Sequence, residues 1–314
     1  MTLAGVAQQQ LNVEVLQHGP TSWINIQHPG VAEMQYLKDR FNFHQLALDD
    51  CLSVVQMPKL DLFEDHIFLV LHFPRFNKDT RITQASEVDV FAGANYVITV
   101  HDGNLRPLTK LFQDCQTSKD LRETMMSQGS GYLMYRILDT LVDYCFPILN
   151  KVIDNVNLVE AQVFETWNPN IVREMARLRH DILSYRRIVR PQIEVLEAME
   201  ARHFPFLKLN PDIYFGDLAD HMRHIWSELE DLKEIIEGLY DSQDSLTNLH
   251  TSDVIRTLTG VATVLLPFLM VSGIYGMNVA LPFAGSWWAF WFVLLITSMM
   301  SLGLWLLLKL GRWL

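Results

Sequence analysis

The sequence predicts an α+β membrane protein: an N-terminal α/β domain, a long helical stalk and two C-terminal transmembrane helices. Two long apolar runs lie near the C-terminus, and helical periodicity fills most of the chain before them. Strand-like and helix-like patterns alternate over roughly the first hundred residues. The expected division is an α/β domain at 1–115, a helical bundle at 116–211, a stalk helix at 212–253 and a transmembrane hairpin at 254–314.

The α/β domain is indicated by short β-branched and aromatic stretches that surround two helical patterns. Apolar residues recur at helical spacing over 31–40 and 45–55. The residues Ala92-Gly93-Ala94-Asn95 favour a hairpin turn between the last two strands. The expected strands are 13–16, 23–26, 67–73, 88–91 and 96–101.

Helical patterns dominate from Pro107 onward. Two amphipathic stretches, 133–167 and 171–199, precede a third that starts near Asp212 and meets no proline before Pro267. A single helix of about 65 residues would be roughly 95 Å long at 1.5 Å per residue. Propensity alone does not stabilise a lone helix of that length, so it must pack against the preceding helices or against copies of itself.

The apolar runs cover 254–276 and 286–310, and we expect transmembrane spans at 254–276 and 286–308. Each is long enough to cross ~30 Å of hydrocarbon as a helix. Because a short loop joins them, both flanks of the hairpin must lie on one side of the bilayer. The loop carries no Lys or Arg and the N-terminus shows no secretion signal, so we expect the large domain and both termini on the cytoplasmic side of the inner membrane.

Composition limits the function classes. The net charge of −11 disfavours nucleic acid as a partner, and near a pore it would concentrate cations. Cys51, Cys115 and Cys145 have no paired spacing, so we expect reduced structural thiols. The sequence contains no phosphate loop, GxSxG or HExxH motif, and no enzyme is expected.

The first apolar run ends in Tyr275-Gly276-Met277-Asn278. Together with LALDDCLSVVQMPKLDLFEDHIFLVLHF at 46–73, YFGDLADH at 214–221 and SLTNLHTSDVIRTLTGVATVLLP at 245–267, it makes the chain resemble the CorA family of divalent cation channels. The resemblance covers nearly the whole chain and implies a homopentameric funnel whose first span lines the pore. Gly276, Met277 and Asn278 would form the outer pore entrance. Without the other segments, Gly-Met-Asn also suits a helix C-cap.

The resemblance further implies Mg²⁺ as the transported and regulatory ion, with Co²⁺ or Ni²⁺ as further cargo. Mg²⁺ holds its waters tightly and prefers octahedral oxygens at ~2.1 Å. A ring of Asn278 amides would meet the hydrated ion without the tight binding that fixed carboxylates would bring. Gly276 would let the backbone turn and present its carbonyl groups.

A candidate pore face follows from steps of three or four residues along the stalk helix, starting at Asp241. This face is polar before the membrane and apolar within it. Rings of Leu258 and Leu266 would close the pore by excluding water. Ordinary helix–helix packing is the alternative for any one leucine. The candidate pore-lining residues are Asp241, Asn248, Ser252, Ile255, Leu258 and Leu266.

Asp50 and Asp217 match the acidic pair of the family's intracellular regulatory metal site, which forms between neighbouring subunits. Bound Mg²⁺ would hold the subunits together and the pore closed, and loss of the ion would let the carboxylates repel. Two solvated surface acids are the alternative. Asp217, Asp220, His221 and His224 also share one helical face, and this donor set would suit Zn²⁺, Co²⁺ or Ni²⁺.

The external loop at 279–285 departs from the family pattern, because Phe283 follows Pro282 where members often carry Pro-Glu. This keeps a ZntB-like zinc transporter, with or without proton coupling, as a second hypothesis. A membrane-anchored cytoplasmic enzyme or scaffold is the third, and there the hairpin is only an anchor. The expected partners are further copies of the chain, the lipid bilayer and divalent metal ions.

Overall fold

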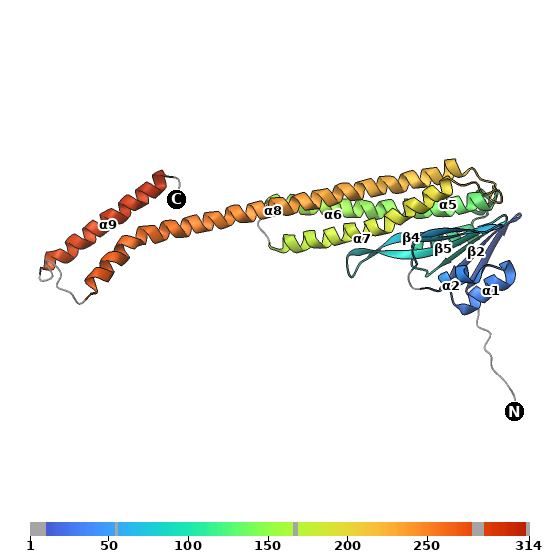
Figure 1. The fold of residues 1–314 in the computed structure, drawn as a ribbon, viewed down its shortest axis with the longest axis horizontal. Coiled ribbons are helices and arrows are strands. Elements are labelled where there is room, and N and C mark those ends of the chain that lie inside the picture. Colours follow the sequence, from blue (N-terminus) through green and yellow to red (C-terminus); the bar gives the residue numbers. More distant parts are fainter. Residues whose placement is uncertain (1–10, 54–55, 166–168, 278–285, 312–314) are drawn as a thin grey trace, which may run out of the picture. The chain divides into compact units, whose positions relative to one another are not determined.

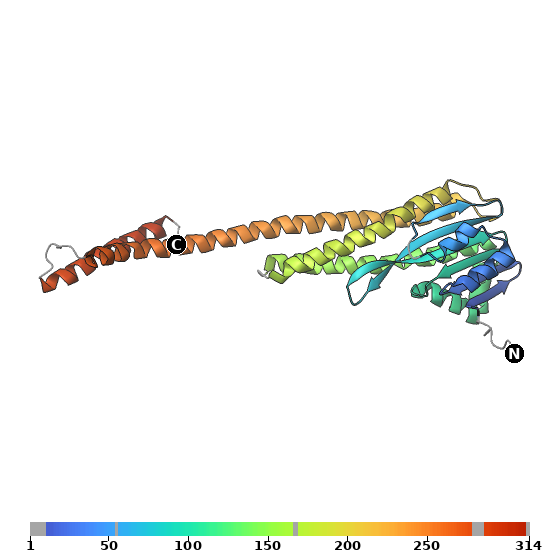
Figure 2. The same cartoon turned by 60° about the horizontal axis from the view of Figure 1, so that its bottom comes forward.

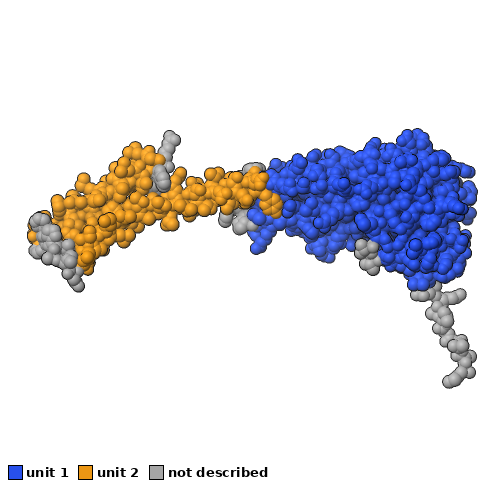
Figure 3. All heavy atoms as spheres, in the orientation of Figure 1, with its two compact units in different colours: residues 1–239 blue, residues 240–314 orange. Residues whose placement is uncertain are grey.

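The computed structural model describes residues 11–53, 56–165, 169–277 and 286–311. The chain divides into two compact units, residues 1–239 and 240–314, which Figure 3 draws in blue and orange. One helix, α8 (Pro211–Tyr275), contributes residues to both units. The α+β class with a long helix and an apolar C-terminal helix pair is confirmed, whereas the four-part division into domains stays a prediction.

The first unit contains a six-stranded sheet with the strand order β1-β2-β6-β5-β4-β3. Strands β2 and β6 are parallel, and the other neighbouring pairs are antiparallel. The N-terminal strand pair therefore joins the sheet beside the last strand of the domain. The strands are β1 (Val13–His18), β2 (Thr21–Gln27), β3 (Lys59–Leu62), β4 (His66–Asn77), β5 (Ile82–Gly93) and β6 (Tyr96–His101).

The sequence patterns located five of these strands. The expected segments 67–73 and 88–91 are parts of two longer strands of 12 residues each, β4 and β5. Strand β3 was not expected. Helix α2 (Gln45–Asp50) is shorter than the expected helix at 45–55. Beyond its end, the N–H groups of Leu52 and Ser53 donate to the carbonyl groups three residues earlier instead of four. This pattern is common at helix ends.

Helices α1 (Val31–Phe41) and α2 cover one face of the sheet (Figure 1 and Figure 2). The connection between them meets the sheet at Phe91, whose ring centroid lies 4.3 Å from that of Phe43 and 4.4 Å from that of Phe68 in β4. All three rings are buried. Stacked aromatic rings contribute beyond the area they bury, so this cluster fixes the two short helices on the sheet.

Further helices cover the opposite face of the sheet. Trp23 of β2 packs edge-on against Phe112 and donates from Nε1 to Thr99 Oγ1 at 3.1 Å. The backbone N–H of Thr83 in β5 donates to the buried carboxylate of Asp181. These contacts join the sheet to the helices around it. The helices are α3 (Arg106–Thr117), α4 (Lys119–Met126), α5 (Ser130–Asp143), α6 (Cys145–Glu165) and α7 (Pro169–Glu200).

Helix α8 has 65 residues, which confirms the long helix that the absence of proline before Pro267 predicts. Its part in the first unit packs against α7. Arg186 forms an ion pair with Glu230, and its guanidinium carbon lies 4.6 Å from the Trp226 ring centroid. The long helix is thus stabilised over its first turns by tertiary contacts within the chain, as its length requires.

The second unit consists of the rest of α8 and helix α9 (Trp287–Leu310). Both helices are long and apolar enough to cross a membrane. They meet at a pocket of about 270 Å³ whose lining includes Phe268, Tyr275 and Thr297. Most of their large apolar side chains are exposed, including Leu269 at 71% and Phe290 at 64%. Such a surface requires lipid or further protein around it.

Candidate functional site

The C-terminal end of α8 forms a tight turn. The Gly276 N–H donates to the Ser272 carbonyl at 2.9 Å, and the Met277 N–H donates to the Ile274 carbonyl at 3.2 Å. A Cβ at Gly276 would lie 3.1 Å from the Ser272 oxygen, tighter than most such contacts, so the backbone there would have to shift by a few tenths of an ångström. Glycine therefore suits this position best. Asn278, the third residue of the predicted pore entrance, lies outside the described residues.

The predicted pore-lining residues all lie on α8, and all are exposed in the single chain. Ile255 is 58% exposed, Leu258 68% and Leu266 51%. Exposure does not separate a pore face from a lipid face, because most neighbouring side chains of this helix are exposed as well. The assignment of Asp241, Asn248 and Ser252 to the same face stays a prediction.

Hydroxyl groups along this part of α8 bond within the helix. The Oγ1 atoms of Thr251, Thr257 and Thr263 each donate to the carbonyl four residues earlier, at 2.8–2.9 Å. Ser245 does the same with Asp241. These side chains satisfy their own hydrogen-bonding needs, so an apolar environment is tolerated next to them.

Asp50, the first residue of the predicted regulatory pair, is the last residue of α2. Its Oδ2 lies 2.7 Å from Lys59 Nζ, and its Oδ1 accepts from Gln56 Nε2 at 3.0 Å. Lys59 also lies against Asp61. Burial lowers the pKa of Lys59, but the hydrogen bonds with the two carboxylates outweigh this and raise it overall. Asp50 is therefore already paired inside its own chain.

Asp217, the second residue of that pair, lies on α8 with its side chain 49% exposed. Its Oδ1 is 3.9 Å from His221 Nε2. Two acids of α5 bear on this region: burial and Asp143 raise the pKa of Asp139, and Asp217 contributes in the same direction, while Asp139 is ion-paired with Arg136 at 2.7 Å. Sequence reasoning missed these two acids. Their spacing at i and i+4 was readable, but not the packing of α5 beside α8.

The remaining members of the predicted helical-face set have other partners. Asp220 forms an ion pair with Arg223. The rings of His221 and His224 lie 5.9 and 6.2 Å from that of Phe146. Across the residues that the structure describes, no three His, Cys, Asp or Glu side chains lie close enough to hold a metal ion. A metal site on this face stays a prediction and would need ligands from another copy.

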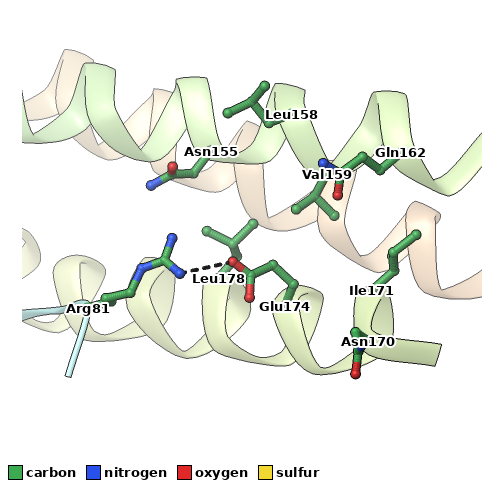
Figure 4. Close-up of a pocket in the computed structure, with 9 residues that line it drawn as sticks. All are labelled: Arg81, Asn155, Leu158, Val159, Gln162, Asn170, Ile171, Glu174 and Leu178. Atoms are coloured by element: carbon green, nitrogen blue, oxygen red, sulfur yellow. Dashed lines mark ion pairs between the residues drawn. The ribbon is translucent and has the colours of Figure 1, made fainter. Parts of the chain in front are cut away.

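A pocket of about 240 Å³ lies between α6 and α7, and Figure 4 shows the side chains that line it. Arg81 forms an ion pair with Glu174 at 3.3 Å, and Arg177 also contacts this carboxylate. The amides of Asn155 and Gln162 line the same space. The only carboxylate among the described lining residues is thus neutralised by arginine, so this pocket does not attract a cation.

Comparison with known proteins places the fold in a class. The complete structure of the CorA magnesium transporter from Methanocaldococcus jannaschii matches with a TM-score of 0.82 at 20% identity, covering 95% of this chain and 93% of that one. The full-length CmaX protein matches with a TM-score of 0.73 at 21% identity, covering 99% and 93%. These two likenesses establish the fold, which the chain shares over nearly its whole length. Residues 19–310 match the CorA-like Mg²⁺ transporter protein family, and the chain belongs to this family.

Similarity to individual relatives extends over most of each chain. YfjQ of Bacillus subtilis is 31% identical over 256 residues, 82% of this chain and 78% of that protein. The cobalt/magnesium transport protein CorA of Thermotoga maritima is 27% identical over 298 residues, 93% and 83% of the two chains. The zinc transport protein ZntB of Yersinia pseudotuberculosis is 21% identical over 299 residues, 93% and 88%. Family and fold are those of transporters, in agreement with the expectation that the chain is not an enzyme.

Proposed function

We propose that this protein is a divalent cation channel of the cytoplasmic membrane that carries Mg²⁺, and also Co²⁺ or Ni²⁺, down the membrane potential. The carrying observation is that Gly276-Met277-Asn278 follows directly on α8, whose last turns are apolar and exposed. Relatives named as cobalt/magnesium transport proteins support this choice of ion. Both termini are proposed to lie in the cytoplasm.

A single chain cannot enclose a path for an ion, because its second unit holds two apolar helices. The proposal therefore requires a ring of copies, and the family resemblance gives five. In such a ring the exposed side of α8 would line the path. Asp241, Asn248 and Ser252 would face water, and Leu258 and Leu266 would form apolar constrictions that exclude water when the ring is tight.

The pore entrance would distinguish cations by how tightly they hold their water shell. Mg²⁺ gives up its waters reluctantly, so amide oxygens that accept hydrogen bonds from those waters can hold the hydrated ion weakly enough for release. Gly276 supports this role, since it directly follows the end of α8, its N–H donates to the Ser272 carbonyl, and a larger residue would be crowded there. No charged residue lies between Arg256 and Lys309, so fixed charge plays no part in selection over this stretch.

Regulation is proposed to act through Asp50 of one copy and Asp217 of the next. Mg²⁺ between these carboxylates would replace their repulsion with attraction and favour the closed ring. Asp217 is half exposed and its charge acts unfavourably on Asp139 of α5, so a cation bound at Asp217 would relieve this repulsion. The ion itself would then close its own path when it is abundant.

A zinc transporter is the second candidate. The similarity to ZntB over 93% of the chain favours it, as does the contact between Asp217 and His221, because imidazole with carboxylate suits Zn²⁺ better than Mg²⁺. The third hypothesis, an anchored enzyme or scaffold, is not favoured by membership of a transporter family.

The test is ion flux through purified protein in liposomes. Mg²⁺ uptake driven by a diffusion potential is expected, and Asn278→Ala should reduce it strongly, whereas Asn150→Ala, at an exposed position of α6, should not. Zn²⁺ uptake that exceeds Mg²⁺ uptake and responds to a pH gradient would favour the second candidate instead. Unchanged flux in Asn278→Ala, or a monomer in both detergent and lipid, would refute the channel.

A further inference from the structure

A basic pocket of about 630 Å³ lies in the first unit, and none of the predicted metal and pore residues lines it. The end of β4, the connection from β6 to α3 and the start of α6 contribute its lining. Its charged lining residues are all basic, and two aromatic rings line it as well. The residues that matter here are Arg75, Lys78, Arg106, Lys151, Phe76 and Tyr144.

Four cationic side chains around one pocket are unexpected in a chain with a net charge of −11. Within the part of the chain that the structure describes, none of the four forms an ion pair with a carboxylate. Asp102 is close along the chain, but its oxygens accept from Asn104 at 2.9 and 2.6 Å and from Ser86 at 3.2 Å. Among the described residues the four positive charges therefore have no direct carboxylate partner, and they repel one another.

Arg75 carries the clearest sign of a missing partner. Its Nη1 reaches Asn104 Oδ1 only at 3.4 Å, and its Nε is buried without a hydrogen-bond partner among the described residues. Lys151 Nζ lies 4.9 Å from the Phe76 ring centroid, a contact that positions an ammonium group but leaves its charge uncompensated. Both groups are held at the pocket and retain donors for an acceptor.

We propose that this pocket binds a soluble nucleotide through its phosphate groups. Arginine forks and lysine ammonium groups are the side chains that bind phosphate oxygens best, and four of them match a di- or triphosphate. Phe76 and Tyr144 offer flat surfaces for a base. The volume is within the usual range of about 300–1,000 Å³ for small-molecule sites. Nucleotide phosphates also bind Mg²⁺ through their oxygens. The pocket would therefore bring the transporter into contact with a soluble anion that binds its proposed cargo.

Calorimetry on the full-length protein in detergent, without divalent ions, tests the proposal with three probes. ADP and pyrophosphate should bind saturably and more weakly at high salt, ADP the tighter of the two, and adenosine should not bind. Arg75→Gln and Lys151→Gln should each weaken ADP binding by about tenfold. Lys119→Gln, an exposed lysine at the start of α4, is the matched control and should leave binding unchanged.

A second measurement needs no variant. Acetylation of surface amines, read by mass spectrometry, should fall at Lys78 and Lys151 when ADP is present and stay constant at Lys119. The proposal is overturned if neither ADP nor pyrophosphate binds, if ADP binds equally to the glutamine variants, or if ADP gives no protection. Equal affinity for ADP and pyrophosphate would overturn the nucleotide assignment. None of these results bears on ion flux, because Asn278 and the pore-lining residues are not part of this pocket.

Discussion

Lys59 Nζ lies 2.7 Å from Asp50 Oδ2, so the carboxylate proposed to bind the regulatory ion has a cationic partner in its own chain. Lys59 contacts Asp61 as well, and its raised pKa keeps the ammonium charged at physiological pH. A divalent ion that binds Asp50 must therefore share the carboxylate with Lys59 or displace it. The strength of the Lys59–Asp50 ion pair therefore affects the Mg²⁺ concentration needed to occupy Asp50.

Removal of this competitor should increase the sensitivity to metal. Lys59→Gln is expected to lower the Mg²⁺ concentration that closes the channel, by at most roughly fivefold, since a partly exposed ion pair contributes about 0.2–1 kcal/mol. Liposome flux measured against internal Mg²⁺ reports the shift. Lys110→Gln, an exposed lysine of α3, should leave the curve in place. A shift toward higher Mg²⁺ would contradict the role of Asp50.

Asp217→Asn tests the other half of the regulatory pair. The wild-type protein, freed of metal with EDTA, should gain thermal stability when Mg²⁺ is returned, by about 2.7 kcal/mol at 100 times Kd. In Asp217→Asn most of this gain should disappear. Asp231→Asn is the matched control, because Asp231 is an exposed acid of α8 outside the predicted metal residues. Equal gains in both variants would show that Asp217 does not bind the ion.

Leu258 and Leu266 are proposed to exclude water from the closed pore. Leu258→Ser should raise Mg²⁺ flux at high internal Mg²⁺, where the wild-type channel is closed, because a polar ring no longer favours the empty state. Val264→Ser changes a residue roughly on the opposite side of the helix, at about 100° per residue, and should leave the closed channel tight. A leak in Val264→Ser but not in Leu258→Ser would mean that the pore face is wrongly assigned.

Asp89 makes stability depend on pH. It lies in β5 between Val70 and Val100, is 3% exposed, and its Oδ1 has no hydrogen-bond partner among the described residues. Burial, with Glu87 adding to it, raises its pKa well above the usual value. The folded state therefore favours the protonated form of Asp89, which contributes to the free energy of unfolding. This stabilisation is complete below the unfolded pKa of about 3.9 and is lost as pH rises through the folded pKa.

Asp89→Asn should remove this loss. Its unfolding temperature, followed by tryptophan fluorescence, should fall less than that of the wild-type protein as pH rises. At neutral pH it should be the more stable by about 1–3 kcal/mol. Asp79→Asn, at an exposed position after β4, should reproduce the wild-type profile. Parallel profiles for wild type and Asp89→Asn would show that the carboxylate is ionised in the fold without penalty.

Local patterns in the sequence are sufficient for much of this fold. The length of α8 follows from a proline-free stretch, and the apolar helices follow from composition, since both properties are written in consecutive residues. Strand β3 is only four residues long and gave no periodic signal. It is stabilised by pairing with β4, a contact that the sequence of β3 does not contain.

The candidate site was predictable only in part. Asp50 and Asp217 were found by resemblance, but not the partners that surround them. Lys59 reaches Asp50 because β3 returns beside α2, and Asp139 approaches Asp217 because α5 packs near α8. Such contacts depend on how distant segments come together, which a pattern within one segment cannot show. The same limit hid the basic pocket.

Because helix α8 is continuous, the number of its residues fixes the direction in which each of its faces points. Each residue advances an α-helix by about 100°, so one amino acid inserted between its first and last turns would rotate everything after it by that amount about the axis. Seven inserted residues would restore the original facing to within about 20°. Insertions of seven residues should therefore be tolerated in α8 more easily than insertions of one. A series of variants with one to seven inserted residues would show which face of the helix function depends on.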